Sequence, residues 1–138
     1  MDTFNKFNLS KHLQNGIDDL NFIHPTPIQE ETFSVILSGK DVVGIAQTGT
    51  GKTLAYMLPI LEEFKYSKEI NPKVLILVPT RELVLQVVDN IESFAKYISI
   101  RVIGVYGGAN INTQRQDLAQ GADIVVATPG RLYDLALN

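Results

Sequence analysis

Apolar residues near the start of the chain recur every three or four positions. The first set is Leu9, Leu13, Ile17 and Leu20. With Ser10 as a candidate N-cap, this spacing predicts an amphipathic helix over residues 10–21. A second helix is predicted from Thr26 to about Gly39, with Pro27 at its first position and Gln29 where a capping box requires it.

The rest of the chain alternates short apolar segments with helical patterns. The segments that read as buried strands are residues 41–45, 74–78, 100–105 and 123–127. Helices are predicted from about Leu54 to about Lys65, over 81–95, near 113–119 and after Pro129. Alternating helices and fully apolar strands predict an α/β fold with a parallel sheet in three layers.

Composition narrows the class of protein. The 138 residues are 45% apolar and 20% charged, which is typical of one soluble globular domain. The chain has no cysteine, which excludes disulfides and cysteine-ligated metals and fits a cytoplasmic location. No apolar run is long enough to span a bilayer, so no membrane contact is expected. A net charge of -3 argues against binding of polyanions by bulk electrostatics. His12 and His24 have no ligand-spaced partners.

The strongest chemical signal lies directly after the first predicted strand. It is the run Ala46, Gln47, Thr48, Gly49, Thr50, Gly51, Lys52 and Thr53. Its two glycines permit a tight turn whose N–H groups approach phosphate oxygens, and the following helix points its N-terminus at the same anion. Lys52 adds a positive charge for the outer phosphates, and the Thr53 hydroxyl is a candidate Mg²⁺ ligand. The alternative is a glycine-rich turn that carries a chance lysine.

Three further clusters each follow a predicted strand. They are Pro79, Thr80, Arg81 and Glu82; Gly107 and Gly108; and Thr128, Pro129, Gly130 and Arg131. The first and last offer a hydroxyl, free helical N–H groups and an arginine, which bind a phosphodiester backbone without reading bases. Taken singly, the first cluster is better explained as a helix start capped by Thr80, and the last has the same ambiguity. A plain loop explains the glycine pair equally well. Because ligands bind beyond the carboxyl ends of parallel strands, we expect these clusters to line one edge beside the nucleotide.

Phe22, shortly before Gln29, suggests recognition of a base. An aromatic ring can stack on a base, and a glutamine amide can pair with the N6 donor and N7 acceptor of adenine, a match that guanine spoils. A core phenylalanine and a capping glutamine remain an equal alternative on local evidence.

These ordered motifs resemble the first RecA-like domain of a DEAD-box ATP-dependent RNA helicase. The family's adenine-recognition segment matches residues 4–29, through Phe4, Phe22, Pro25, Thr26, Ile28 and Gln29. The family's phosphate loop begins with alanine, which matches Ala46 at the start of the loop here. The family's RNA-backbone motifs match the three clusters described above. Asn21 and Val84 depart from the family pattern, where glycine and alanine are usual.

The resemblance implies ATP and Mg²⁺ as cofactors, with Lys52 and Thr53 acting on the phosphates, and RNA as a partner bound through its backbone. The Asp-Glu-Ala-Asp motif that would hold Mg²⁺ and position the attacking water is not among the 138 residues. We therefore expect residues 1–138 to be a partial ATP-binding domain of a longer enzyme, which has a second RecA-like domain. Alone, the chain is expected to bind ATP without hydrolysing it appreciably. The alternatives are another phosphate-loop nucleotidase or kinase, and a non-catalytic nucleotide- and RNA-binding fragment.

Overall fold

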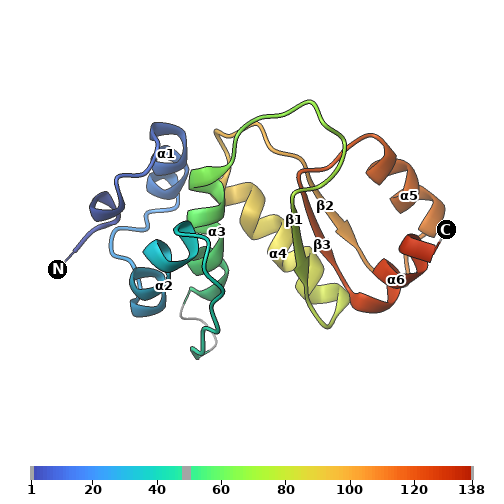
Figure 1. Ribbon diagram of the computed structural model, residues 1–138, viewed down its shortest axis with the longest axis horizontal. Coiled ribbons are helices and arrows are strands. Elements are labelled where there is room, and N and C mark those ends of the chain that lie inside the picture. The colour runs from blue at the N-terminus through green and yellow to red at the C-terminus, as the bar shows by residue number, and fades with distance from the viewer. Residues whose placement is uncertain (1, 48–50, 138) are drawn as a thin grey trace. The chain divides into compact units, whose positions relative to one another are not determined.

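The computed structural model describes residues 2–47 and 51–137 (Figure 1). The chain divides into two compact units. The first consists of Met1–Lys65 with Ser93–Ile98, and the second of Tyr66–Glu92 with Ser99–Asn138.

The first unit is helical in its described part. Its elements are the 3-10 helix η1 (Phe4–Phe7), α1 (Lys11–Asp19), α2 (Pro27–Leu37) and α3 (Lys52–Glu63). The three α-helices confirm the predicted ones, and each ends two residues before its predicted end. The buried apolar side chains include Phe4, Leu13, Ile17, Phe33, Leu54, Met57 and Leu58.

A threonine compensates for a proline inside α3. Pro59 has no N–H, so it cannot donate to the carbonyl of Ala55 one turn earlier. The Thr32 hydroxyl of α2 lies 3.4 Å from that carbonyl oxygen and 2.7 Å from the carbonyl oxygen of Ile28. Because buried carbonyls need a donor, Thr32 makes Pro59 tolerable where α2 packs on α3.

Residues 93–98 are joined to α1 by one close approach and one polar cluster. A side chain at Gly16 would overlap the carbonyl oxygen of Phe94, so only glycine fits there. The Tyr97 hydroxyl donates to the Asp19 carboxylate, and Lys96 Nζ lies 3.1 Å from it. The Tyr97 bond and then the Lys96 ammonium lower the pKa of Asp19.

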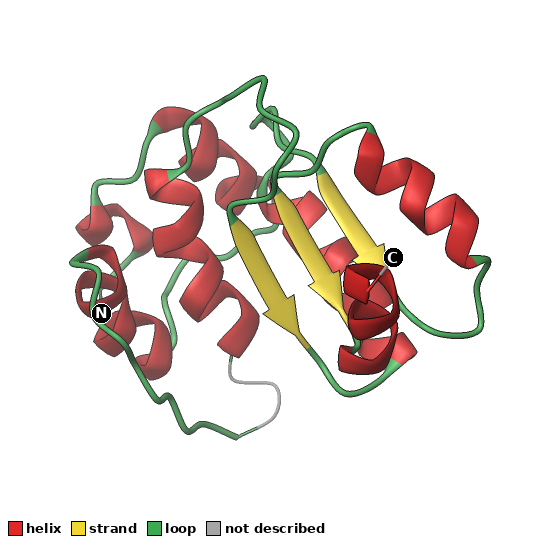
Figure 2. Ribbon diagram, turned by 45° about the vertical axis from the view of Figure 1, so that its right-hand side comes forward, coloured by secondary structure: helices red, strands yellow, loops and turns green. Residues whose placement is uncertain are grey.

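The second unit contains a parallel sheet of three strands in the order β1-β3-β2 (Figure 2). The strands are β1 (Val74–Leu77), β2 (Val102–Val105) and β3 (Ile124–Ala127), each paired in parallel with its neighbour. Helices α4 (Arg81–Phe94), α5 (Ile111–Ala119) and α6 (Pro129–Leu137) follow the strands in turn. These six elements confirm the predicted strands and helices of this half of the chain.

Helices cover both faces of this sheet, which gives the predicted three layers. On one face α4 lies so close that a Cβ on Gly104 would be 2.9 Å from Val84. On the other face Leu118, Leu132 and Leu135 of α5 and α6 pack against a core of Val105, Ala122, Val125 and Ala127. Leu75 and Leu77 of the edge strand β1 are about half exposed on that face, at 52% and 53%.

The predicted strand over residues 41–45 is wrong. Residues 41–47 have no regular secondary structure, and the side chains of Val43 and Ile45 are 91% and 90% exposed. A strand needs a neighbour that pairs with its N–H and C=O groups, and none of the described strands pairs with this segment. The apolar run showed that the segment suits a buried strand, but a run cannot show that a partner strand is present.

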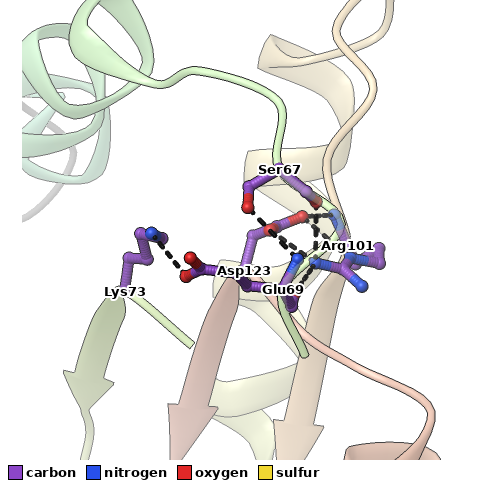
Figure 3. A network of polar contacts seen from close by, with 5 residues as sticks. All are labelled: Ser67, Glu69, Lys73, Arg101 and Asp123. Atoms are coloured by element: carbon purple, nitrogen blue, oxygen red, sulfur yellow. Dashed lines mark hydrogen bonds and ion pairs between the residues drawn. The ribbon is translucent and has the colours of Figure 1, made fainter. Parts of the chain in front are cut away.

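An ion pair fixes the amino ends of the strands, opposite to the predicted RNA edge (Figure 3). Arg101 Nη2 lies 2.9 Å from Asp123 Oδ1, and its Nε and backbone N donate to Asp123 Oδ2. The same Nη2 donates to the carbonyl oxygen of Glu69, at 2.6 Å, in the connector before β1. The Arg101 hydrogen bonds lower the pKa of Asp123 despite its burial. Asp123 directly precedes β3, so it lies at the end of the strand opposite to the carboxyl edge.

Candidate functional site

The end of the phosphate loop has a backbone that requires glycine. Gly51 has φ +83° and is the N-cap of α3, so a residue with a side chain would be strained there. A Cβ would also overlap the side-chain nitrogen of Gln29. Lys52 is exposed in the first turn of α3, whose N–H groups have no partner within the helix. Thr48, Gly49 and Thr50 lie outside the described residues.

Gln29 joins the predicted adenine segment to this loop. It is 4% exposed, and it makes one half of the predicted capping box with Thr26 at the start of α2. Gln29 Oε1 accepts from the Thr26 backbone N–H at 2.9 Å, and Nε2 donates to the Gly51 carbonyl oxygen at 3.1 Å. Gln29 therefore contacts the cap residue as predicted. Its second contact, with Gly51, was not predicted from the local sequence.

Phe22 lies in a turn that presents its ring. Asn21 has φ +59°, so this asparagine adopts the left-handed conformation that a glycine would supply. The Phe22 side chain is 42% exposed and lines a cavity of about 190 Å³ together with Phe4 and Asp18. Phe4 itself is buried, and its backbone N–H donates to the carbonyl oxygen of Ile23. The structure thus assigns Phe4 to the core, whereas Phe22 remains accessible.

A second cavity, of about 290 Å³, adjoins the start of α3. It is lined by Ile28, Thr32, Ile36, Val42, Gly44, Lys52, Ala55 and Tyr56. Burial raises the pKa of Tyr56, and a hydrogen bond to the Thr53 side chain opposes that shift.

In the second unit, all three predicted clusters lie at one edge of the sheet. The backbone N–H of Val78 donates to the Ala127 carbonyl oxygen, and the backbone N–H of Thr128 donates to the Val105 carbonyl oxygen. The three strands therefore end side by side. Pro79, Gly107 and Thr128 follow β1, β2 and β3. The prediction that these clusters share the carboxyl edge is correct for this unit.

Arg81 stands over the loop that follows β2. Its guanidinium carbon lies 5.3 Å from the centre of the Tyr106 ring, which is a cation–π geometry. Gly108 has φ +87°, and a Cβ there would be 3.4 Å from Arg81 Nη1. Thr80 caps α4, because its hydroxyl accepts from the N–H of Leu83 at 3.2 Å. The capping interpretation of Thr80 is therefore right, and Arg81 remains exposed.

Arg131 reaches the same loop from α6. Its Nη1 donates to the Ala109 carbonyl oxygen and to Gln114 Oε1, both at 3.0 Å. Sequence reasoning missed Gln114, a buried glutamine in α5, a helix most of whose residues face solvent. Pro129 opens α6 as predicted, and the space around Gly107 and Gly130 is open.

Nowhere in residues 2–47 and 51–137 do three His, Cys, Asp or Glu side chains gather in a way that could hold a metal ion. Within the same ranges, no helix has the length and apolar character needed to cross a membrane.

The sequence and fold match known helicases. Residues 26–138 match the family model described as DEAD/DEAH box helicase. The chain is 46% identical to the DEAD-box ATP-dependent RNA helicase CshA of Streptococcus pneumoniae, over 96% of this chain and 25% of that protein. It is 44% identical to the ATP-dependent RNA helicase DeaD of Haemophilus influenzae, over 96% of this chain and 22% of that protein.

A solved structure agrees with these relatives. The crystal structure of a hypothetical ATP-dependent RNA helicase from Sulfolobus tokodaii is similar with a TM-score of 0.83 and 40% identity, covering 94% of this chain and 37% of that one. The chain spans 11% to 25% of the length of the relatives that it matches.

Proposed function

The chain belongs to the DEAD/DEAH box helicase family, and we propose that it binds ATP and RNA as part of an ATP-dependent RNA helicase. The observation that carries the nucleotide half is the hydrogen bond from Gln29 to Gly51. It joins the residue that would recognise adenine to the glycine that ends the phosphate loop. A fixed distance between base and phosphate subsites is what a nucleoside triphosphate requires.

In this proposal the adenine stacks on Phe22 and pairs with Gln29. Gln29 uses one N–H and one oxygen lone pair within the protein. The remaining N–H and the remaining lone pair are the donor and acceptor that adenine N7 and N6 need. The exposed ring of Phe22 supports the stacking role.

The phosphates would lie at the N-terminus of α3. Lys52 is exposed there, and Gly51, whose φ of +83° suits glycine, starts the helix without a side chain beside its unpaired N–H groups. The donor set also fits Mg²⁺, which proteins commonly hold through one hydroxyl or carboxylate together with phosphate oxygens. Thr53 would supply that hydroxyl, and bound Mg²⁺ would neutralise phosphate charge.

RNA would lie along the carboxyl edge of the sheet in the second unit. Arg81 and Arg131 are held beside one loop by a ring contact and by hydrogen bonds. The N-termini of α4 and α6 and the hydroxyls of Thr80 and Thr128 supply further donors to phosphates. Such contacts bind the RNA backbone without reading its sequence.

For the whole enzyme, we propose RNA-dependent ATP hydrolysis that also needs a second RecA-like domain. For these 138 residues by themselves, we propose binding without appreciable hydrolysis, since the Asp-Glu-Ala-Asp motif is not among them. The alternative function, a non-catalytic fragment that binds nucleotide and RNA, makes the same prediction for these 138 residues. Hydrolysis of ATP by the chain alone would reject both.

The test uses the purified chain with a fluorescent ATP derivative in the presence of Mg²⁺, and separately with a labelled single-stranded RNA. The proposal predicts saturable binding of both ligands, competition of the nucleotide by unlabelled ATP, and no phosphate release above the background rate. A chain that circular dichroism shows to be folded, and that binds neither ligand, would contradict the proposal.

A further inference from the structure

One buried side chain links two parts of the proposed RNA edge. Gln114 of α5 is 6% exposed, although most residues of that helix face solvent. Its Nε2 donates to the Tyr106 carbonyl oxygen at 3.1 Å, and its Oε1 accepts from Arg131 Nη1 at 3.0 Å. Each end of the amide therefore has its own partner, one in the loop after β2 and one on α6.

These contacts set the direction of the Arg131 guanidinium. Nη1 alone makes both of them, to Gln114 and to the Ala109 carbonyl oxygen. Neither of these two contacts involves Nε or Nη2 of Arg131. Those two nitrogens form the edge of the guanidinium that can donate two parallel hydrogen bonds to a phosphate. An arginine held at one nitrogen loses less side-chain entropy on binding than one that moves freely.

The same contacts hold the loop that carries the two glycines. Tyr106 and Ala109, whose carbonyl oxygens accept from Gln114 and Arg131, flank Gly107 and Gly108. Arg81 lies over the Tyr106 ring from α4. Both arginines of the proposed RNA track are thus attached to one short loop, and Gln114 supports that loop from the interior.

The neutrality of the amide matters as well. A carboxylate at this position would also accept from Arg131, but it would neutralise the positive charge that the phosphate needs. Glutamine orients the guanidinium and leaves its charge intact.

We infer that Gln114 is a positioning residue for RNA, which sets Arg131 and the Tyr106–Ala109 loop for contact with a phosphodiester backbone. This inference rests on the proposed function. It predicts that removal of Gln114 weakens RNA binding only through Arg131 and the loop, and leaves ATP binding unchanged.

The test is a double-mutant cycle, read as the affinity for single-stranded RNA at several salt concentrations. Arg131→Ala is expected to weaken binding about tenfold and to reduce the salt slope by about 0.7, the value for one lost phosphate contact on a single strand. Gln114→Leu is expected to weaken binding by a similar factor. Because Gln114 also supports the loop, the double variant is expected to bind somewhat more weakly than the Arg131→Ala single variant, but more tightly than the two single losses added together predict. Gln116→Leu, an exposed glutamine of the same helix, is the matched control and is expected to bind as wild type.

Gln114→Glu separates positioning from folding. It keeps an acceptor for Arg131 but, like Gln114→Leu, loses the donor to the Tyr106 carbonyl oxygen. Both variants are therefore expected to lower the midpoint of thermal unfolding by a similar amount, while only Gln114→Glu keeps the contact with Arg131; in Gln114→Glu the RNA affinity and the salt slope both fall. Two results would overturn the inference and leave the proposed function intact. One is a double variant whose loss of RNA-binding free energy equals the sum of the two single losses. The other is wild-type RNA affinity in a folded Gln114→Leu variant.

A second measurement does not need RNA. In NMR spectra of the free protein, rotation of the Arg131 guanidinium is expected to be slow in wild type and in Gln114→Glu, and fast in Gln114→Leu. Equal rotation in all three proteins would remove the positioning role. If the folded wild-type chain binds no RNA at all, the proposed RNA function fails, and the inference fails with it.

Discussion

Gln29 donates a hydrogen bond to the carbonyl oxygen of Gly51, 22 residues further along the chain, at 3.1 Å. The same amide accepts from Thr26, so its orientation is fixed from both ends. The side chain that would select adenine therefore also sets the residue from which the phosphate-binding helix starts. A change at either residue should affect both binding and stability.

Gly51→Ala tests the loop side of this contact. At φ +83° an alanine costs about 1–2 kcal/mol, and its methyl group would displace the Gln29 side chain. We expect the midpoint of thermal unfolding to fall by several degrees and ATP affinity to fall at least tenfold, measured by calorimetric titration.

Gly39→Ala is the matched control for that variant. Gly39 has φ +85°, but nothing lies within 4 Å of the added methyl group. The strained backbone of the Gly39→Ala variant should lower the midpoint of thermal unfolding, and the variant should bind ATP as tightly as wild type. Equal loss of ATP affinity in both variants would show that strain alone, rather than the contact with Gln29, explains the effect.

Thr32→Val tests the compensation for Pro59. The substitution removes the hydroxyl that bonds Ile28 and lies near the Ala55 carbonyl, and nearly preserves volume. We expect a loss of about 1–2 kcal/mol in the free energy of unfolding by urea. Thr32→Ser keeps the hydroxyl and should lose less than half as much. The account of α3 is wrong if the valine variant is as stable as wild type.

Asp123→Asn tests the ion pair at the amino ends of the strands. Because its pKa is lowered in the folded state, Asp123 stabilises the fold above the ordinary pKa near 4, and this stabilisation is lost as pH falls through the folded value. At pH 7 the variant should be about 1–3 kcal/mol less stable than wild type, and the difference should shrink below pH 4.

Urea unfolding at several pH values measures this effect. Asp117→Asn, which changes an exposed carboxylate of α5, is the matched control and should change the free energy of unfolding at pH 7 by no more than about 0.5 kcal/mol. A stability difference between wild type and Asp123→Asn that stays constant from pH 7 to pH 3 would refute the assignment to ionisation.

Arg81→Ala tests the RNA edge independently of Arg131. The variant should bind single-stranded RNA about threefold to tenfold more weakly and with a salt slope reduced by about 0.7. Arg115→Ala removes an arginine whose Nη1 pairs with Asn112 on α5, and it should change RNA affinity little. If the two variants weaken binding equally, the effect reflects net charge rather than a phosphate contact.

The sequence predicted the helices and three of the strands because their signals are local. The spacing of Leu13 and Ile17, the Pro27 helix start and the apolar run of 124–127 each act within a few residues. The predicted strand over residues 41–45 is wrong because strand formation depends on pairing with another segment. An apolar run carries no information about whether that segment is present.

The site residues divide in the same way. Caps at Thr26, Thr80 and the left-handed turn at Asn21 follow from residue type and spacing, and could be predicted. Gln114 and the contact of Gln29 with Gly51 depend on residues that are distant in sequence. A buried glutamine in a polar helix has no local pattern that distinguishes it from its exposed neighbours.

The most direct measurement is a calorimetric titration of the chain with ATP and with GTP in the presence of Mg²⁺, repeated with a folded Gln29→Ala variant. If Gln29 reads adenine while it holds Gly51, wild type should bind ATP at least tenfold more tightly than GTP, and the variant should lose this preference along with affinity. Equal affinity of wild type for the two nucleotides, or an unchanged preference in the variant, would contradict the account.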